Sequence, residues 1–253
     1  MTGRDRSGVR QIVLVLILTI VAGLAMGCGM TTSSNPETAA PNEDQAPTID
    51  PQDLVQSVVG IRASGCSLVH SLGSGVAIAS NQVATAAHTV AGAKLIEVGV
   101  DKAGNNTDGL QWLVGSIVAF DKDNDLAIIE IEPSPNLVFR PLATRVTLQP
   151  GFLGTWDPDR GLTVVDVEIS RRLQVTIEDI YIDEIMVRPA IEIKGTVTRG
   201  DSGGPIFTRD GQIAGIVYAS SRHRDTAAFA TRASEVVPLQ ATAGQSDQKG
   251  RCH

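Results

Sequence analysis

The stretch Gly200-Asp201-Ser202-Gly203-Gly204-Pro205 has the residue types that a serine nucleophile requires. A serine hydroxyl attacks a carbonyl carbon only when a base takes its proton and hydrogen-bond donors hold the oxyanion that forms. Glycines on both sides of Ser202 allow a tight turn and bring backbone amides close to a bound carbonyl group. The sequence therefore predicts Ser202 as a nucleophile, with the amides of Gly200 and Ser202 as an oxyanion hole. Because Asp-Ser-Gly-Gly alone also fits an ordinary polar turn, the prediction depends on partners elsewhere in the chain.

The base for such a serine has to be a histidine, and His88 is the best candidate of the four in the chain. It ends a strand-like run that begins at Val83, and the alanines before it leave room for an imidazole to turn inward. The other three, His70, His223 and His253, lie in polar or terminal segments, where solvated roles are expected.

A third group has to orient the imidazole and stabilise its cation. The candidates are Asp121, Asp123 and Asp125. We favour Asp125 because it directly precedes the apolar run Leu126–Ile131, which would seat a carboxylate at the start of a strand. The chain order His, Asp, Ser strengthens a signal that is weak for an aspartate taken singly.

Three blocks around these residues resemble the signature blocks of the chymotrypsin-clan serine proteases: Thr85 to His88, Asp125 to Ile128 and Gly200 to Pro205. More narrowly, residues 51–253 are similar to the membrane-tethered extracytoplasmic serine proteases associated with acid resistance in mycobacteria and their relatives. That closer similarity rests on Gly73 to Val76, Gly215 to Ala219, Ala228 to Thr231 and a cysteine close to the C-terminus. The resemblance implies a serine endopeptidase that hydrolyses peptide bonds through an acyl-enzyme on Ser202, with His88 as base and Asp125 as the orienting carboxylate.

The resemblance also implies a pocket for the residue before the cut bond, with its floor near Thr196 and a wall formed by Tyr218, Ala219 and Ser220. Thr196 is uncharged, so nothing supports a preference for Arg or Lys. Tyr218 replaces the small polar residue that supports the catalytic aspartate in the best-known digestive members, which leaves open how Asp125 is held.

Asp201 needs a partner of its own, because a buried carboxylate without one is costly. In zymogen proteases the equivalent carboxylate pairs with a newly freed N-terminus, which an N-terminal tether excludes. An arginine is expected to take that place, with Arg140, Arg145 and Arg199 as the candidates.

Residues 1–30 predict a membrane anchor. Arg4, Arg6 and Arg10 precede an uncharged apolar run whose length is near that of a membrane span, and the positive flank stays in the cytoplasm. The rest of the chain is therefore expected on the extracytoplasmic, periplasmic face of a bacterial cell membrane. Ala25 to Cys28 also resembles a lipoprotein cleavage site, so a signal-anchor helix and lipidation of Cys28 both remain open.

Residues 31–50 are rich in Thr, Ser, Asn, Pro and acidic side chains and predict a disordered, flexible linker. From residue 51 the pattern changes to short strands separated by turn residues, and no long helical period follows the anchor. The predicted strands are 55–62, 75–79, 95–100, 113–120, 126–131, 152–155, 162–168, 174–177, 186–193, 213–218 and 227–230, with a short helix from 233 to 239. This pattern indicates an all-β fold, and the resemblance implies a chymotrypsin-like double β-barrel over about 51–135 and 150–240, with the triad in the cleft between the barrels.

Composition excludes several other classes of partner. A net charge of −7 argues against nucleic acid, and no cysteine–histidine spacing suggests a metal site. No glycine-rich segment lies between a strand and a helix, so no nucleotide and no other cofactor is expected. The expected partner is a protein or peptide substrate in the cell envelope.

The folded region contains two of the three cysteines, Cys66 and Cys252, since Cys28 belongs to the anchor. An extracytoplasmic location permits disulfides, and the polar tail around Cys252 has no apolar neighbours to bury a free thiol. The sequence therefore favours a Cys66–Cys252 disulfide over two unrelated thiols.

Two other functions remain compatible with these residues. One is a catalytically silent domain of the same fold that binds a peptide in its cleft and reports the state of the envelope. The other is an esterase that uses the same triad.

Overall fold

The structure, a computed structural model, describes residues 48–103, 109–221, 224, 226–245 and 250–252. The predicted anchor, Cys28 and most of the predicted linker lie outside the described residues. Within the described residues, no helix has the length and apolar character needed to cross a membrane.

Among the described residues, twelve strands form two closed antiparallel barrels of six strands each. The first barrel has the strand order β1-β2-β3-β6-β5-β4 and contains β1 (Val58–Ser64), β2 (Ser71–Ala79), β3 (Gln82–Thr85), β4 (Leu95–Asp101), β5 (Leu110–Asp121) and β6 (Leu126–Ile131). The second barrel has the order β10-β11-β12-β9-β8-β7 and contains β7 (Pro150–Asp157), β8 (Gly161–Glu178), β9 (Ile185–Lys194), β10 (Pro205–Thr208), β11 (Ile213–Ser220) and β12 (Ala227–Arg232). Three helices accompany them: α1 (Pro51–Val55), α2 (Ala87–Val90) and α3 (Ala233–Ala241).

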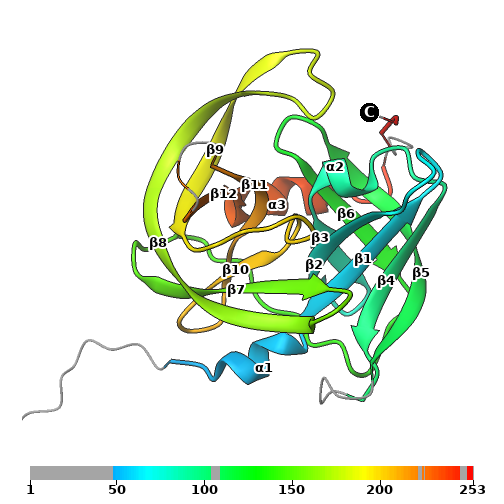
Figure 1. Ribbon diagram of the computed structural model, residues 1–253, viewed down its shortest axis with the longest axis horizontal. Coiled ribbons are helices and arrows are strands. Elements are labelled where there is room, and N and C mark those ends of the chain that lie inside the picture. The colour runs from blue at the N-terminus through cyan, green and yellow to red at the C-terminus, as the bar shows by residue number, and fades with distance from the viewer. Residues whose placement is uncertain (1–47, 104–108, 222–223, 225, 246–249, 253) are drawn as a thin grey trace, which may run out of the picture. The chain divides into compact units, whose positions relative to one another are not determined.

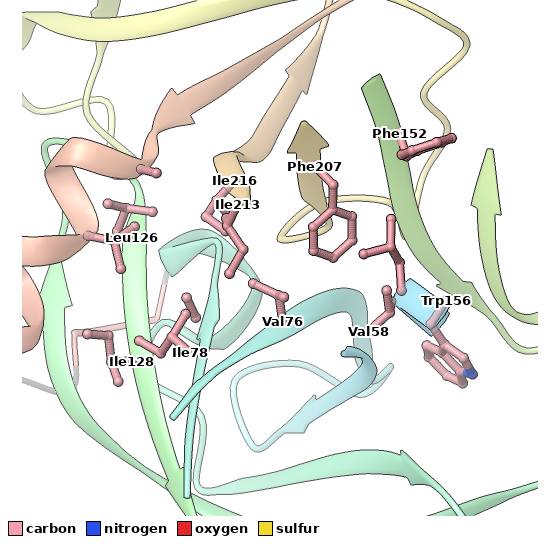
Figure 2. Packing of buried hydrophobic residues seen from close by; sticks show 14 of the residues in the cluster. Val58, Val76, Ile78, Leu126, Ile128, Phe152, Trp156, Phe207, Ile213 and Ile216 are labelled. Carbon is pink, nitrogen blue, oxygen red and sulfur yellow. The ribbon is translucent and has the colours of Figure 1, made fainter. Parts of the chain in front are cut away.

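The two barrels share an apolar interface, because several strands of the first barrel are buried on both faces. Successive side chains of a strand point to opposite faces. In β6, Ala127 and Ile129 fill the first barrel, whereas Leu126 and Ile128 point outward into a cluster that also contains Phe207 of the second barrel. Figure 2 shows this shared cluster, in which side chains of β2 and β6 approach those of β7, β10 and β11. The interface fixes where the edges of the two barrels meet.

A long hairpin of β8 and β9 extends the second barrel. The pairing runs without interruption from Glu168 opposite Lys194 to Glu178 opposite Ile185, with one bulge near Ser170. Figure 1 shows β8 as a long curved strand that continues past the barrel wall. At the hairpin tip, the buried Asp179 carboxylate accepts hydrogen bonds from the amides of Tyr181 and Asp183. It also accepts one from the ammonium group of Lys122 in the first barrel, at 2.9 Å.

Three sequence predictions about elements are wrong in detail. Val55 ends helix α1 rather than starting a strand, because Asp50 accepts the amide of Gln52 and caps a helical turn that begins at Pro51. The predicted strands 162–168 and 174–177 are one strand, β8, since the polar residues between them pair with β9. The run that ends at His88 is a strand only as far as Thr85, and His88 lies on helix α2.

Candidate active site

The Ser202 loop of the second barrel is held by the first barrel. The Ser74 amide donates to the Ser202 carbonyl at 2.8 Å, and the Ser74 hydroxyl donates to the Gly200 carbonyl at 3.0 Å. The same hydroxyl accepts the amide of Trp156 on β7 at 2.8 Å. Ser74 is fully buried on β2, so one residue of the first barrel fixes the loop between β9 and β10 of the second.

His88 lies on α2, whose first turn is built around the Asp125 residue. The His88 amide donates to Asp125 Oδ1 at 2.9 Å, and the Ala87 amide donates to the Asp125 carbonyl at 3.2 Å. The His88 ring then returns to the same carboxylate, with Nδ1 at 2.7 Å from Asp125 Oδ2. Backbone and side chain of His88 therefore contact both oxygens of one carboxylate.

Asp125 is 4% exposed and stands at the end of a tight turn between β5 and β6. Its backbone has a φ of 54°, a left-handed conformation that is uncommon outside glycine. Asp121 builds the turn by accepting the amides of Asp123 and Asn124 at 2.9 Å each. Asp123 is exposed and contacts Lys122, so Asp125 is the one of the three candidate aspartates that contacts His88.

The two ionisable groups shift one another's pKa in opposite directions. Burial favours the neutral form of each, but the opposite charge and the hydrogen bond between them outweigh it. The pKa of the His88 imidazole is raised and the pKa of the Asp125 carboxyl is lowered. The arrangement stabilises an imidazolium, the species that forms when a histidine takes a proton from a nucleophile.

Arg188 on β9 is a member of this site that the sequence analysis missed. It is 2% exposed, and its Nη1 lies 3.8 Å from Asp125 Oδ2. Its Nε donates to the Asp123 carbonyl at 2.8 Å, and its guanidinium carbon stands 4.5 Å from the centre of the Tyr218 ring. The presence of Tyr218 in place of a small polar residue left open how Asp125 is held. The structure places Arg188 beside Asp125. The available signal was a lone cation within the predicted apolar strand 186–193.

The glycines around Ser202 shape the loop for close backbone approach. Gly200 has a φ of 101° and Gly203 a φ of 86°, which glycine adopts without strain. A side chain on Gly203 would place its Cβ 2.1 Å from the Ser74 carbonyl oxygen. Within the part of the chain that the structure describes, the amides of Gly200 and Ser202 donate to no other protein group, so both are free to bind a ligand.

Asp201 is held by threonine and not by an arginine, so the expectation for Arg140, Arg145 or Arg199 is wrong. Asp201 Oδ2 accepts the amide of Thr198 at 2.7 Å and its hydroxyl at 3.0 Å. A local turn thus supplies the donors that the carboxylate needs, and Arg140 instead donates to Ser57 and to the Asp53 carbonyl.

Ser202 and His88 line the same cleft, which has a volume of about 650 Å³. The other walls include Leu72 of β2, Trp156 of β7 and the exposed Arg199. A larger cavity of about 790 Å³ is lined by Phe120, Tyr181 and Leu239 and contains neither Ser202 nor His88. The two predicted catalytic residues therefore meet in the smaller cleft.

A second groove, of about 690 Å³, contains three of the four residues expected to form the substrate pocket. Tyr218, Ala219 and Ser220 line it together with the mainly apolar side chains Val175, Ile177, Ile185 and Phe229. Thr196 is exposed in the segment between β9 and Gly200 and does not line this groove. Arg224 closes one side of the groove, and its guanidinium binds the buried Glu192 at 2.7 and 3.0 Å.

The Tyr218 hydroxyl is buried and has no hydrogen-bond partner among the described residues. Burial raises the pKa of Tyr218 to about 12. Tyr218 therefore stays neutral and contributes its ring, on which Arg188 stacks, rather than a proton-transfer group.

Three carboxylates near the hairpin tip, Asp123, Asp179 and Glu184, lie close enough together to suggest a cation site. The Lys122 ammonium contacts all three, at 2.9, 2.9 and 3.1 Å. A side-chain cation thus already neutralises this cluster.

The cysteines Cys66 and Cys252 form a disulfide with a Cα–Cα distance of 5.4 Å, the pairing that the cysteine count favours. Cys66 also lines a cleft of about 350 Å³ that reaches His88. The bond joins a loop beside the site to the C-terminal tail.

Comparisons with known proteins identify the family of the chain. Residues 73–216, more than half of the chain, match the family described as the trypsin-like peptidase domain. The chain is 30% identical over 199 residues to serine protease Rv3671c of Mycobacterium tuberculosis strain H37Rv, and to serine protease MT3772 of strain CDC 1551. The match covers 77% of this chain and 48% of either relative, so the chain spans about half the length of the curated relatives it matches.

Several solved protease structures are similar to this chain in fold. The active form of the Rv3671c protease aligns with a TM-score of 0.70 at 25% identity, over 82% of this chain and 93% of that one. An inactive form of the same protease aligns with a TM-score of 0.63 at 26% identity, over 79% of this chain and 98% of that one. The HtrA-type protease AlgW, at 20% identity, a TM-score of 0.63 and coverage of 77% and 63%, supports the fold alone. The two barrels are those of the all-β chymotrypsin-like fold, and the chain belongs to the trypsin-like peptidase family.

Proposed function

We propose that this protein is a serine endopeptidase that hydrolyses peptide bonds through an acyl-enzyme on Ser202, tethered at the extracytoplasmic face of the cell membrane. The observation that carries the proposal is the 2.7 Å contact of His88 with the buried Asp125, in a cleft that Ser202 shares. Family membership supports the reaction class. The substrate is a protein or peptide, and no cofactor takes part.

In the first half-reaction, the Ser202 hydroxyl oxygen attacks the carbonyl carbon of the scissile bond, and His88 Nε2 takes its proton. Asp125 accepts the Nδ1–H hydrogen bond, which fixes the tautomer that leaves Nε2 free as a base. The amides of Gly200 and Ser202 stabilise the oxyanion. Collapse of the tetrahedral intermediate breaks the C–N bond, and His88 gives its proton to the leaving amine.

In the second half-reaction, a water molecule attacks the acyl-enzyme. His88 takes a proton from this water and returns it to Ser202 when the ester bond breaks. The raised pKa of His88 suits this role, because an imidazolium must persist long enough to protonate each leaving group.

The substrate backbone has an open strand edge beside the nucleophile. Pairing of β10 with β11 ends at Ile216, whereas β12 pairs with β11 as far as Ser220. Tyr218, Ala219 and Ser220 therefore have one edge free to accept an extended peptide, with the apolar groove next to them. We assign this wall, together with Thr196, to substrate selection, and we expect uncharged rather than basic residues before the cut bond.

The tether rests on the sequence of residues 1–30, whether as a spanning helix or as a lipid on Cys28. The Cys66–Cys252 disulfide supports an extracytoplasmic location, because reducing conditions in the cytoplasm disfavour such bonds.

The test is active-site labelling of the full-length protein in detergent with a fluorophosphonate probe, followed by peptide mapping. We expect the label on Ser202, no label on Ser202→Ala, and a loss of hydrolysis of roughly 10⁴-fold or more in Ser202→Ala and His88→Ala. Ser71→Ala is the matched control, because Ser71 is an exposed serine that lines the same cleft. Labelling with ester but no peptide hydrolysis would identify an esterase. A folded protein that takes no label would instead be a silent peptide-binding module.

A further inference from the structure

We infer that Arg188 is a positioning residue of the site, which aims the Asp125 carboxylate at His88 and places a fixed, buried positive charge behind the pair. The inference rests on the proposed function, since it assigns Arg188 a part in preparing the base. It concerns a residue of the second barrel that acts on two residues of the first.

The contacts of Arg188 converge on the turn that carries Asp125. Its Nε donates to the Asp123 carbonyl at 2.8 Å, and its Nη1 lies 3.8 Å from Asp125 Oδ2. The second distance is too long for a hydrogen bond, so Arg188 acts on the carboxylate by charge. On its other side the guanidinium stacks on the Tyr218 ring at 4.5 Å.

The burial of Arg188 needs an explanation that the fold alone does not provide. A fully buried cation without a counter-charge is strongly unfavourable. Among the ion pairs of the described residues, Arg188 pairs with Asp125 alone. Asp125 is therefore the counter-charge that offsets the burial of Arg188. Removing either group would leave the other as an uncompensated buried charge.

Holding the turn in place does not by itself require a cation. Thr231 on β12 donates its hydroxyl to the Asn124 carbonyl at 2.7 Å and holds the same turn without any charge. Lys122, at the start of the turn, is tied to Asp179 on the β8–β9 hairpin. The separate contribution of Arg188 is its charge, which at 2% exposure is little screened by water.

The charge affects proton binding by the pair. The groups that face His88 from the surrounding elements are Asp125, Arg188, Tyr218, Glu178, Asp179, Asp157, His70 and Arg199. Asp157 is partly exposed and pairs with Arg160. Tyr218 is neutral, Asp179 is paired with Lys122, and Glu178, His70 and Arg199 are exposed to solvent. Arg188 is thus the buried cation nearest the pair, and it lowers the pKa of both His88 and Asp125. It opposes the rise that Asp125 causes in the pKa of His88, and so keeps the imidazole available as a base in more acidic solution.

The experiment follows the His88 ring by NMR as pH is varied, in the full-length Ser202→Ala protein, which needs no turnover. Arg188→Gln removes the charge and keeps a donor for the Asp123 carbonyl, so the His88 titration should move to higher pH. Arg188→Lys keeps a charge on a shorter side chain and should move it by less. Thr231→Val removes an uncharged contact to the same turn and should move it by much less than Arg188→Gln does. With Ser202 intact, the acid limb of kcat/KM should move in the same direction and order.

An unmoved His88 titration in folded Arg188→Gln would overturn the inference, and so would an equal shift in Thr231→Val. If Arg188→Gln fails to fold, Arg188→Met decides, because it also removes the charge with a side chain of similar length, and an unmoved titration in that variant overturns the inference as well. Failure of the proposed function is a separate outcome, since it appears as absent labelling in the native protein whatever the NMR titration shows.

Discussion

Asp125 combines a strained backbone with an unusually complete set of contacts. Its left-handed φ of 54° turns the chain so that the side chain and the carbonyl both point at the first turn of α2. Strain of this kind persists only where the surroundings over-determine the conformation. Here the surroundings are Asp121 within the turn, and Arg188 and Thr231 from the second barrel.

The three neighbouring aspartates give a test of this assignment. Asp125→Asn should lower kcat by roughly 10⁴-fold, because an amide donor favours the wrong imidazole tautomer. Asp123→Asn should stay close to native, since Asp123 is exposed and contacts only Lys122 with its side chain. Asp121→Asn should reduce stability more than activity, because its new amide group cannot accept the hydrogen bond that Asn124 Nδ2 now donates to Asp121 Oδ2. Steady-state kinetics with matched melting curves separate these effects, and an active Asp125→Asn beside an inactive Asp123→Asn would show that the wrong carboxylate was chosen.

Local sequence predicted the residues that lie in signature blocks and missed those brought in by the fold. The contact of His88 with Asp125, and the cleft that His88 shares with Ser202, were predictable because these residues stand in recognisable sequence contexts. Arg188 and Ser74 approach the site from other strands, and their contacts at separations such as Ser74 to Gly200 depend on barrel closure. The predicted partner of Asp201 was wrong for a different reason, because a four-residue turn, Thr198 to Asp201, supplies the donors locally and no long-range arginine is needed.

At the scale of elements, the Ser202 loop depends on the absence of a side chain at Gly203. We expect Gly203→Ala to abolish activity and lower Tm by about 10 °C, since its Cβ would collide with the Ser74 carbonyl and its φ is positive. Gly109→Ala is the matched control, because Gly109 also has a positive φ, 77°, but has open space around its Cβ position. It should lower Tm by only about 3 °C. Equal effects of the two substitutions would mean that backbone strain, rather than the contact with β2, decides.

The wall of the apolar groove is held by a buried carboxylate. Glu192 on β9 is 2% exposed and binds Arg171 of β8 and Arg224 of the segment after β11. The hydrogen bond to Arg224 and the nearby charge of Arg171 lower the pKa of Glu192 from its usual 4.5 to about 2. A lowered pKa in the folded state means that the stabilisation is complete above about pH 4.5 and is lost as pH falls toward 2.

Glu192→Gln should therefore lower Tm clearly at pH 7, and the difference from native should shrink as pH falls from 4.5 toward 2. Glu168→Gln provides the comparison, since Glu168 is 51% exposed and pairs with Lys194 on the same two strands. Its effect should stay small at every pH, as for other exposed ion pairs. Thermal melts across this pH range are the measurement, and a Glu192→Gln penalty that stays constant down to pH 2 would contradict the assignment.

Most strands were predictable from the sequence, but several of their ends were not. Short apolar runs bounded by turn residues identified strands that pack both barrels, including 126–131 and 213–218. The 18-residue strand β8 was divided in two because Ser170, Arg171 and Arg172 interrupt the alternation, yet they pair with β9 through a bulge. Helix α2 was not predicted, because its four residues carry too little periodicity and its first turn is organised by Asp125.

At the scale of the molecule, the disulfide closes a loop of 186 residues around both barrels. Loop entropy gives it a ceiling of about 5 kcal/mol, so the double substitution Cys66→Ser and Cys252→Ser should lower Tm by about 10 °C or more. Activity should fall as well, because the loop of Cys66 borders the His88 cleft. Scanning calorimetry and non-reducing peptide mapping are the measurements, with Cys28→Ser as the control that leaves the bond intact. Two free, alkylatable thiols in protein from the envelope would exclude the bond.

The mass of the mature protein distinguishes a lipidated Cys28 from a membrane-spanning helix. If Cys28 is lipidated, the mature chain begins there, and Cys28→Ala should retain the whole of residues 1–27. If the segment is a spanning helix, native protein and Cys28→Ala should keep the same N-terminus. Intact mass spectrometry of membrane-extracted protein distinguishes the two, and a native chain that retains residues 1–27 without added lipid mass would eliminate the lipoprotein alternative.

The contacts of Ser74 have a consequence for the order in which the protein matures. The first barrel leaves the ribosome first and can close on its own strands, but it contains no nucleophile. The second barrel contains Ser202, but the loop around that residue takes its shape from hydrogen bonds that Ser74 donates across the interface. Proteolytic competence, on the proposed function, is thus acquired in the final docking step and not in the folding of either half. If the chain is exported as proposed, it carries no complete site while it passes through the export machinery.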